Sequence, residues 1–358
     1  MRNGSRTFLA ASALLPKQVR EAACALYAFC RLADDAVDGL DALPGEAGSS
    51  GGKSRRIALD RLRQRLARVY QGAPMDHPTD RALAEVVTRF AIPSALPEAL
   101  LEGFQWDVDG RQYDTLDDVL DYAARVAGSV GAMMALLMGV RSAKGLARAC
   151  ELGVAMQLSN IVRDVGEDAR NARLYLPRQW LVDAGIDPDG WLARPVFSPA
   201  LGGVVQRLLA TADELYARVG AGIAELPITC RAGINAARHL YADIGHEVAR
   251  RGLDSVGQRA VVPARRKLSL LLYALGELPL IACAGTDGAP VPLAATQFLI
   301  DAVVRGRHAP PSYEVLVGPV APRGVRQRLI RIIELFERLE RRERGECLAV
   351  GTSSPPRL

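Results

Sequence analysis

The chain has 358 residues, of which 49% are apolar and 24% charged, and it carries a net charge of +5. These values are ordinary for a soluble globular protein with a large core, built as one big domain or two. No apolar run reaches the roughly 18 uncharged residues that would span a bilayer, and Lys17 and Arg20 interrupt the apolar start, so we expect neither a membrane span nor a signal peptide.

The basic excess comes almost entirely from arginine and suits anionic small molecules or an anionic membrane surface. Basic runs with interleaved aromatics, zinc motifs and helix-turn-helix signatures are all missing from the sequence, which argues against a nucleic-acid partner. The six cysteines form no C-x-x-C pair, and several lie in apolar stretches. We therefore expect reduced, mostly buried thiols in a cytoplasmic protein.

Apolar residues recur at helical spacing along most of the chain. The first predicted helix covers residues 8–38 and ends at a Gly/Ser/Pro-rich break over 41–53. Later helices are predicted over 55–71, 81–90, 97–108, 122–140, 146–164, 200–225, 230–251 and 265–278, with 114–120 leading into one of them. Residues 284–320 are rich in Gly and Pro and poorly periodic, and 323–344 form a last basic amphipathic helix. Alternating strand patterns and internal repeats are absent, so the predicted fold class is all-α.

The apolar stretch 122–140 has small residues at its centre, Gly128-Ser-Val-Gly131. Small residues allow two helices to approach closely or a ligand to lie against the backbone. Plain core packing explains them equally well, and the sequence leaves the alternatives open.

The first of two acidic motifs closes the first helix and reads Tyr27-Ala-Phe-Cys-Arg31-Leu-Ala-Asp34-Asp35-Ala-Val-Asp38. At about 100° per residue, its tyrosine, arginine and three aspartates fall within an arc of roughly 100°. Carboxylates stacked on one helix face repel each other unless a positive charge lies between them.

The second acidic motif reads Gln157-Leu-Ser-Asn160-Ile-Val-Arg163-Asp164-Val-Gly-Glu167-Asp168. On the same helical geometry, Gln157, Asn160, Asp164 and Asp168 fall within roughly 80°. The segment around the two amides is otherwise apolar, so their side chains need polar partners if they are buried.

Oxygen ligands of this kind suit Mg²⁺, which binds through one or two carboxylates together with substrate phosphates. Arginine is the natural bidentate partner of a phosphate group. Two such faces opposed across a helical bundle would make a metal–diphosphate site between apolar walls. The alternative is a solvated acidic face whose carboxylates pair with nearby arginines.

The motifs in this order and spacing resemble the squalene/phytoene synthase family over about residues 5–278, most of all its bacterial phytoene-forming members. The likeness rests on the two acidic motifs and on three shorter ones, Phe8…Leu14-Leu15-Pro16, Val126-Ala-Gly-Ser-Val-Gly131 and Arg173-x-Tyr175-Leu-Pro177. The resemblance implies an isoprenoid-synthase helical bundle with a central cavity over residues 1–280, followed by an extension over 281–358 with a loop and the basic amphipathic helix.

The activity that this resemblance implies is the head-to-head condensation of two geranylgeranyl diphosphates to phytoene through prephytoene diphosphate, a step of carotenoid biosynthesis. Mg²⁺, with Mn²⁺ as a substitute, is the implied cofactor, and no NADPH is expected. The partners implied are prenyl diphosphates and, through the last helix, the surface of a membrane; the oligomeric state is not implied.

Carried over residue by residue, the resemblance assigns metal binding and catalysis to Asp34, Asp38, Asp164 and Asp168, with Asp35 and Asn160 as further metal ligands. It assigns substrate binding to Tyr27, Arg31, Gln157, Asn160, Arg163, Tyr241, Ser5, Thr7 and Arg265. A helix cap at Ser5, a solvated basic run at Arg265 and a buried structural hydroxyl at Tyr241 stay open as alternatives. Val126–Leu137 would wall the prenyl tunnel.

One departure from the family pattern concerns the chain length of the substrate. Relatives often carry two nearby tyrosines before the Val126 motif, whereas here Tyr122 is followed by Ala124 at the second position. A synthase of squalene, dehydrosqualene or presqualene diphosphate acting on farnesyl diphosphate is therefore the main alternative. A non-catalytic scaffold on the same fold, a terpene cyclase and a head-to-tail prenyl synthase are further alternatives from outside this reaction class.

Overall fold

The regular elements of the computed structural model are helices throughout the residues that it describes, which are 11–38, 51–283 and 291–306. The longer ones are α2 (Lys17–Asp38), α3 (Gly51–Tyr70), α4 (Pro78–Arg89), α5 (Ala95–Asp109), α8 (Ala143–Arg170), α11 (Pro199–Ile223), α12 (Ile228–Arg250) and α13 (Ala264–Gly276). The shorter ones are α6 (Leu116–Ala123), the π-helical turn η1 (Ala124–Gly128), α7 (Ser129–Leu137), α9 (Arg178–Asp183), α10 (Pro188–Ala193), α14 (Leu278–Cys283), η2 (Ala294–Thr296) and α15 (Gln297–Val304). The all-α prediction is confirmed.

Local signals explain where several helices begin. The Ser142 side chain accepts a hydrogen bond from the backbone of Gly145 and caps α8, and Thr115 forms a capping box at the start of α6. The prediction of one unbroken helix over 8–38 is wrong within its described part, because the chain leaves helical structure before Pro16 and α2 begins at Lys17. The predicted helix over 323–344 lies outside the described residues.

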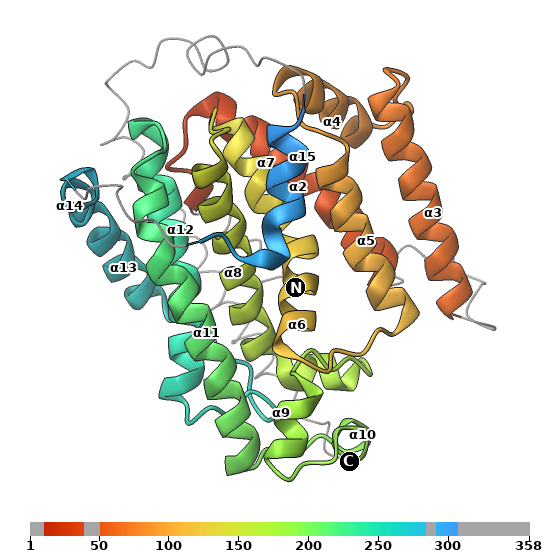
Figure 1. Ribbon diagram of the computed structural model, residues 1–358, viewed down its shortest axis with the longest axis vertical. Coiled ribbons are helices and arrows are strands. Elements are labelled where there is room, and N and C mark those ends of the chain that lie inside the picture. The colour runs from red at the N-terminus through yellow and green to blue at the C-terminus, as the bar shows by residue number, and fades with distance from the viewer. Residues whose placement is uncertain (1–10, 39–50, 284–290, 307–358) are drawn as a thin grey trace, which may run out of the picture.

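Helix α8 lies in the middle of the bundle and packs against α7, α11, α12 and η1 (Figure 1). One hydrophobic core surrounds it and extends from Leu15 to Val303 along the chain. The poorly periodic region 284–320 contains α15, which packs on α5, α7 and α8. The sequence did not indicate this helix, because its burial is decided by neighbours distant in the chain.

Two glycines bring α7 and the π turn against α8. A Cβ atom at Gly131 would lie 2.1 Å from the Ala149 carbonyl oxygen, and one at Gly153 would lie 2.2 Å from that of Ala127. No side chain fits at such separations, so the backbones touch at these points. Close helix approach is therefore what the small residues of this stretch provide.

The stretch Leu116–Leu137, which comprises α6, η1 and α7, is long and apolar enough to cross a membrane by length and composition alone. Its most apolar window is 61% buried inside the structure. Val126, Val130 and Met134 from this stretch line the cavity described below. Its apolar character is thus accounted for by the core and the cavity wall.

Candidate active site

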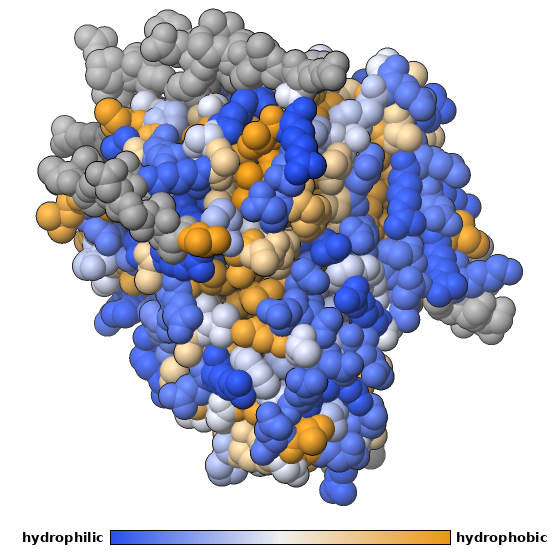
Figure 2. All heavy atoms as spheres, viewed as in Figure 1, coloured by the Kyte–Doolittle hydropathy of each residue, from blue (hydrophilic) through white to orange (hydrophobic). Residues whose placement is uncertain are grey.

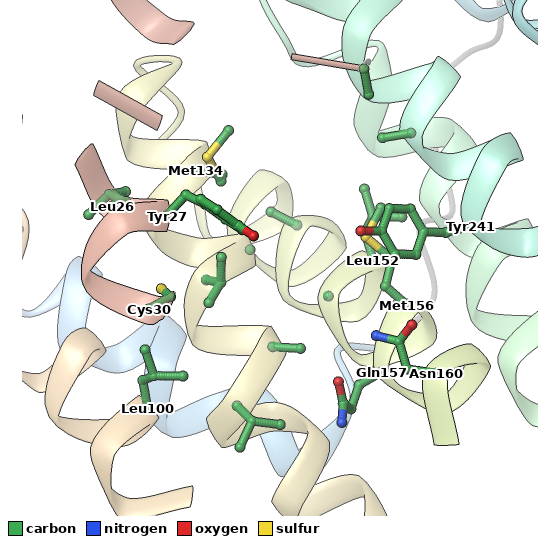
Figure 3. A pocket seen from close by; sticks show the side chains of 18 of the residues that line it. Leu26, Tyr27, Cys30, Leu100, Met134, Leu152, Met156, Gln157, Asn160 and Tyr241 are labelled. Atoms are coloured by element: carbon green, nitrogen blue, oxygen red, sulfur yellow. The ribbon is translucent and has the colours of Figure 1, made fainter. Parts of the chain in front are cut away.

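A cavity of about 400 Å³ runs along α8, whose lining residues extend from Gly145 near its first turn to Asp168 near its last. Side chains from α2, α5, α7, α11 and α12 form the other walls. Leu26, Leu100, Met134, Leu152 and Met156 give these walls their apolar character (Figure 3). The cavity is therefore suited to a long hydrocarbon group with a polar end.

The two acidic motifs meet at this cavity, although they come from different helices. Of the predicted site residues, those that line it are Tyr27, Arg31 and Asp34 from α2, Gln157, Asn160, Arg163, Asp164 and Asp168 from α8, and Tyr241 from α12. The Tyr27 and Tyr241 hydroxyls point from opposite walls into the space between them (Figure 3). The structure thus brings together most of the residues that the resemblance selected.

Of the five other predicted residues, two lie outside the cavity lining, and the side chains of three are not described by the structure. Asp35 is in contact with Arg31 and does not line the cavity. Arg265 is exposed on α13, away from the cavity lining. Asp38 belongs to α2, but its side chain is outside the described part of the structure, as are Ser5 and Thr7 altogether. Their assignments stay predictions.

Asp164 is held by two arginines. The Arg163 Nε donates a 2.8 Å hydrogen bond to it, and Arg259 donates from Nε at 2.8 Å and from Nη2 at 3.2 Å. Burial opposes a charge on this carboxyl, but the hydrogen bonds from Arg163 and the charge of Arg259 hold its pKa below the usual value. Asp164 is therefore a carboxylate with cations already beside it.

Asp168 lies one turn further along the same face of α8. Burial, and next the neighbouring Asp164 carboxylate, raise the pKa of the Asp168 carboxyl well above its usual value. Arg173, which also lines the cavity, acts in the opposite direction. The acidic end of the cavity thus carries carboxylates and guanidinium groups in close proximity.

On the facing wall, Arg31 lies between the two adjacent aspartates of α2. Its Nη2 is 2.7 Å from Asp35, and its Nη1 is 3.6 Å from Asp34. Cys30 lines the cavity beside them, and burial, followed by the charge of Asp34, raises the pKa of its thiol to about 12. The thiol therefore stays protonated and neutral, and part of the apolar wall.

The sequence interpretation missed a second polar group in the cavity, centred on Asp107 of α5. The Tyr122 hydroxyl donates to one of its oxygens at 2.9 Å, and the Tyr175 hydroxyl donates to the other at 2.7 Å. The two tyrosine rings stack with centroids 4.9 Å apart. Asp107 is one of several acidic residues of α5 and lies in neither acidic motif, so no spacing pattern marked it.

Arg259 was missed as well, because it lies in the segment between α12 and α13, far from either acidic motif in the sequence. That segment is tied to α8 by the Gly166 amide, which donates to the Ser255 carbonyl at 3.0 Å. A Cβ atom at Gly166 would lie 2.3 Å from the Val256 carbonyl oxygen, so only glycine allows this approach.

The donor set at the acidic end suits a hard divalent cation. Its oxygens come from Asp34 on one wall and from Asn160, Asp164 and Asp168 on the other. The Asn160 Oδ1 atom is buried and has no hydrogen-bond partner, which is costly unless a ligand completes it. Within the described ranges, no three acidic, His or Cys side chains already form a metal-binding group.

Comparison with known proteins gives a consistent result. Residues 1–267 match the family model described as squalene/phytoene synthase. The chain is 49% identical over 334 residues to a phytoene synthase from Cereibacter sphaeroides, covering 92% of this chain and 93% of that protein. It is 44% identical over 268 residues to a 15-cis-phytoene synthase from a Paracoccus species, covering 75% of this chain and 86% of the relative.

A solved structure of a dehydrosqualene synthase in complex with ligand superposes with a TM-score of 0.68 at 29% sequence identity. It covers 78% of this chain and 94% of that one. A squalene synthase from Alicyclobacillus acidocaldarius superposes with a TM-score of 0.59 at 24% identity and shows the same fold.

Proposed function

The chain belongs to the squalene/phytoene synthase family, and from that premise we propose that it condenses two geranylgeranyl diphosphates head to head to give phytoene. The relatives named phytoene synthase support this choice of substrate through their identity over most of the chain. The observation that carries the proposal is one apolar cavity that has both acidic motifs and their arginines at the same end.

The proposed reaction has two steps, each of which releases one diphosphate and one proton. In the first, the C1–O bond of one substrate breaks, and its allylic cation adds to the double bond of the other to form cyclopropyl prephytoene diphosphate. In the second, that diphosphate leaves, and the C40 cation rearranges and loses a proton to form phytoene. The atoms balance without a reductant, so no NADPH is needed.

Both steps need stabilisation of a departing diphosphate. Arg31, Arg163 and Arg259 supply guanidinium groups at the acidic end, and guanidinium is a bidentate partner of phosphate. The apolar walls exclude water, which would otherwise capture the cation as an alcohol. Charge and hydrocarbon are thus handled at different parts of one cavity.

The residues present fit Mg²⁺, or Mn²⁺ in its place, and Asp34, Asn160, Asp164 and Asp168 would hold it, with Asp35 and Asp38 as further candidates. When bound, the cation would neutralise charge that develops on the leaving diphosphate. The buried Asn160 Oδ1 without a hydrogen-bond partner supports this assignment, because a cation or a bound water would complete it.

Contact with a membrane surface in the cytoplasm is a further part of the proposal. The substrate and product are highly apolar, and Val291, Phe298 and Val304 expose apolar side chains on and beside α15. Figure 2 shows apolar atoms gathered around this helix on a face that is otherwise mostly hydrophilic.

The proposal is tested by incubating the full chain with C15 or C20 prenyl diphosphate, with and without NADPH, and identifying the products. We expect a C40 hydrocarbon from the C20 substrate, independent of NADPH, abolished by a chelator and restored by Mg²⁺. An Asp164→Ala variant with unchanged helicity is the matched inactive control. A C30 product as the main outcome would instead establish the alternative that uses farnesyl diphosphate.

A further inference from the structure

The end of the cavity away from the acidic motifs contains a charged side chain, that of Arg148. It lines the cavity among apolar neighbours that include Met138, Ile223 and Leu226, and its side chain is only 3% exposed. Gly145 lies about one turn closer to the start of α8 and is the lining residue of this helix farthest from the acidic motif. A buried guanidinium at the hydrocarbon end of a cavity has no role in releasing diphosphate at the opposite end.

Arg148 is held in place by Glu151, which is fully buried. One carboxylate oxygen of Glu151, Oε1, lies 3.0 Å from the Arg148 Nη2 and 2.7 Å from the Arg218 Nη2. The same oxygen accepts a hydrogen bond from the Leu293 amide at 3.1 Å, and Arg218 also donates to the Val291 carbonyl. The segment before α15 is thereby fastened to the arginine that lines the cavity.

The aliphatic part of Arg148 fills the space between α8 and α11. A Cβ atom at Gly222 of α11 would lie 2.3 Å from the Arg148 Cβ and 2.6 Å from its Cγ. Because Gly222 also lines the cavity, the arginine stem packs at the cavity wall where the two helices meet. We expect that shortening this side chain opens space at the wall between α8 and α11.

A guanidinium held by these contacts would block a hydrocarbon chain from extending past it. Its guanidinium pairs with Glu151, and a hydrocarbon offers no acceptor that could replace this partner. Pushing it aside would leave the buried Glu151 with one ion-pair partner fewer. An apolar side chain at position 148 could instead shift and admit further methylene groups.

The distance along α8 is comparable with the length of the substrate of the proposed function. Arg148 precedes Asn160, the first metal-site candidate along α8, by 12 residues, which is about 18 Å at 1.5 Å per residue. An extended peptide residue has three backbone bonds and spans ~3.5 Å, which is about 1.2 Å per bond. On the same scale, the main chain of a C20 prenyl group spans ~18 Å and that of a C25 group ~23 Å.

We propose that Arg148 limits the far part of the prenyl cavity and so sets the longest prenyl chain that the enzyme accepts, with Glu151 and the segment Val291–Leu293 as its positioning groups. This inference rests on the proposed function, because it assumes a prenyl diphosphate whose charged end lies at the acidic motifs. Arg148 is thus a specificity-determining residue, and residues beyond the family match at 267 contribute to the site.

The test is a competition between C20 and C25 prenyl diphosphates in one reaction. The ratio of C25 to C20 units is then measured in the products. Arg148→Ala is expected to raise the share of C25 units at least about tenfold over the wild type. Because both substrates meet the same enzyme, the ratio does not depend on the fraction that is folded. Arg305→Ala, which removes an exposed arginine at the C-terminal end of α15, is the matched control and should leave the ratio unchanged.

Glu151→Gln is the second variant and tests the positioning role. It should move the ratio in the same direction by a smaller factor. A lower unfolding temperature with an unmoved ratio in both variants would overturn the inference, since it would mean that the cluster serves stability alone. If the wild type prefers the C15 over the C20 diphosphate, the proposed function fails. The share of C20 units in a competition between C15 and C20 diphosphates then tests the role of Arg148 independently.

Discussion

Asp164 illustrates how one residue of the site depends on groups that are distant in the sequence. It was predicted from its neighbours on α8, but its second guanidinium partner, Arg259, comes from the segment between α12 and α13. Both arginines hold Asp164 in the structure. Under the proposed function, we expect them to donate also to a diphosphate that binds beside this carboxylate.

Arg259→Ala is expected to lower kcat/KM for the C20 substrate by at least about tenfold, because it removes a donor from the developing charge of the diphosphate. The fold should be retained, since Arg163 still pairs with Asp164 and the Arg259 side chain is partly exposed. Steady-state kinetics and thermal unfolding measure the two effects. Arg61→Ala on the exposed face of α3 is the control. Unchanged kinetics in Arg259→Ala would remove this residue from the site.

Helix α8 is the element on which the cavity is built. Along its length it carries Arg148, the glycine that touches the π turn, the two amides and the two aspartates. Its contact with η1 at Gly153 sets the distance between the α8 wall and the η1–α7 wall. Packing at this glycine should therefore affect stability and the width of the cavity together.

Gly153→Ala is expected to destabilise the protein by about 1–3 kcal/mol, because the new methyl group would overlap the Ala127 carbonyl. Gly203→Ala on α11 is the matched control: it has no atom within 4 Å of its Cβ position, so the gain in helix propensity should stabilise the protein by about 0.5–1 kcal/mol. Urea denaturation followed by circular dichroism measures both. Equal effects of the two variants would contradict the close contact.

At the scale of the whole molecule, the main hydrophobic core includes residues of both α2 and α15, and a smaller separate cluster joins α12 and α13. Leu299 of α15 is fully buried, and a Cβ at Gly128 would lie 3.4 Å from its Cδ1 atom. Arg125 joins the same region, with its guanidinium over the Phe298 ring at 5.0 Å and an ion pair to Glu102. Residues 291–304 thus share the packing of the bundle, although they lie beyond the boundary predicted at residue 280.

Leu299→Ala is expected to lower the free energy of unfolding by about 2–4 kcal/mol, because it leaves a cavity against α8 and the π turn. Val304→Ala, at a position that is 53% exposed on the same helix, should change it by less than about 0.5 kcal/mol. A single shifted unfolding transition is the expected form of the result. A separate early transition for Leu299→Ala would show that α15 folds independently of the bundle.

The sequence alone predicted most long helices to within a few residues, since periodicity and caps are local properties. The sequence did not predict helix α15, which depends on burial by distant helices. It also did not predict the break before Lys17, which depends on Pro16 within an apolar run. The candidate site was predicted where carboxylates and arginines repeat at helical spacing. Asp107 and Arg259 were not, because neither belongs to such a repeat and the partners of each lie on other elements.

The sequence by itself determined the chemistry of the acidic faces, because residues spaced by one helical turn must share a face whatever surrounds them. It also determined the family, through motifs that resemble known members. Only the tertiary structure decided that the two faces meet at one cavity, that Arg259 joins them, and that Arg148, paired with Glu151, lies toward the opposite end. The physical reason is that cavity length and charge pairing are set by packing between helices, and a one-dimensional pattern contains no such distances.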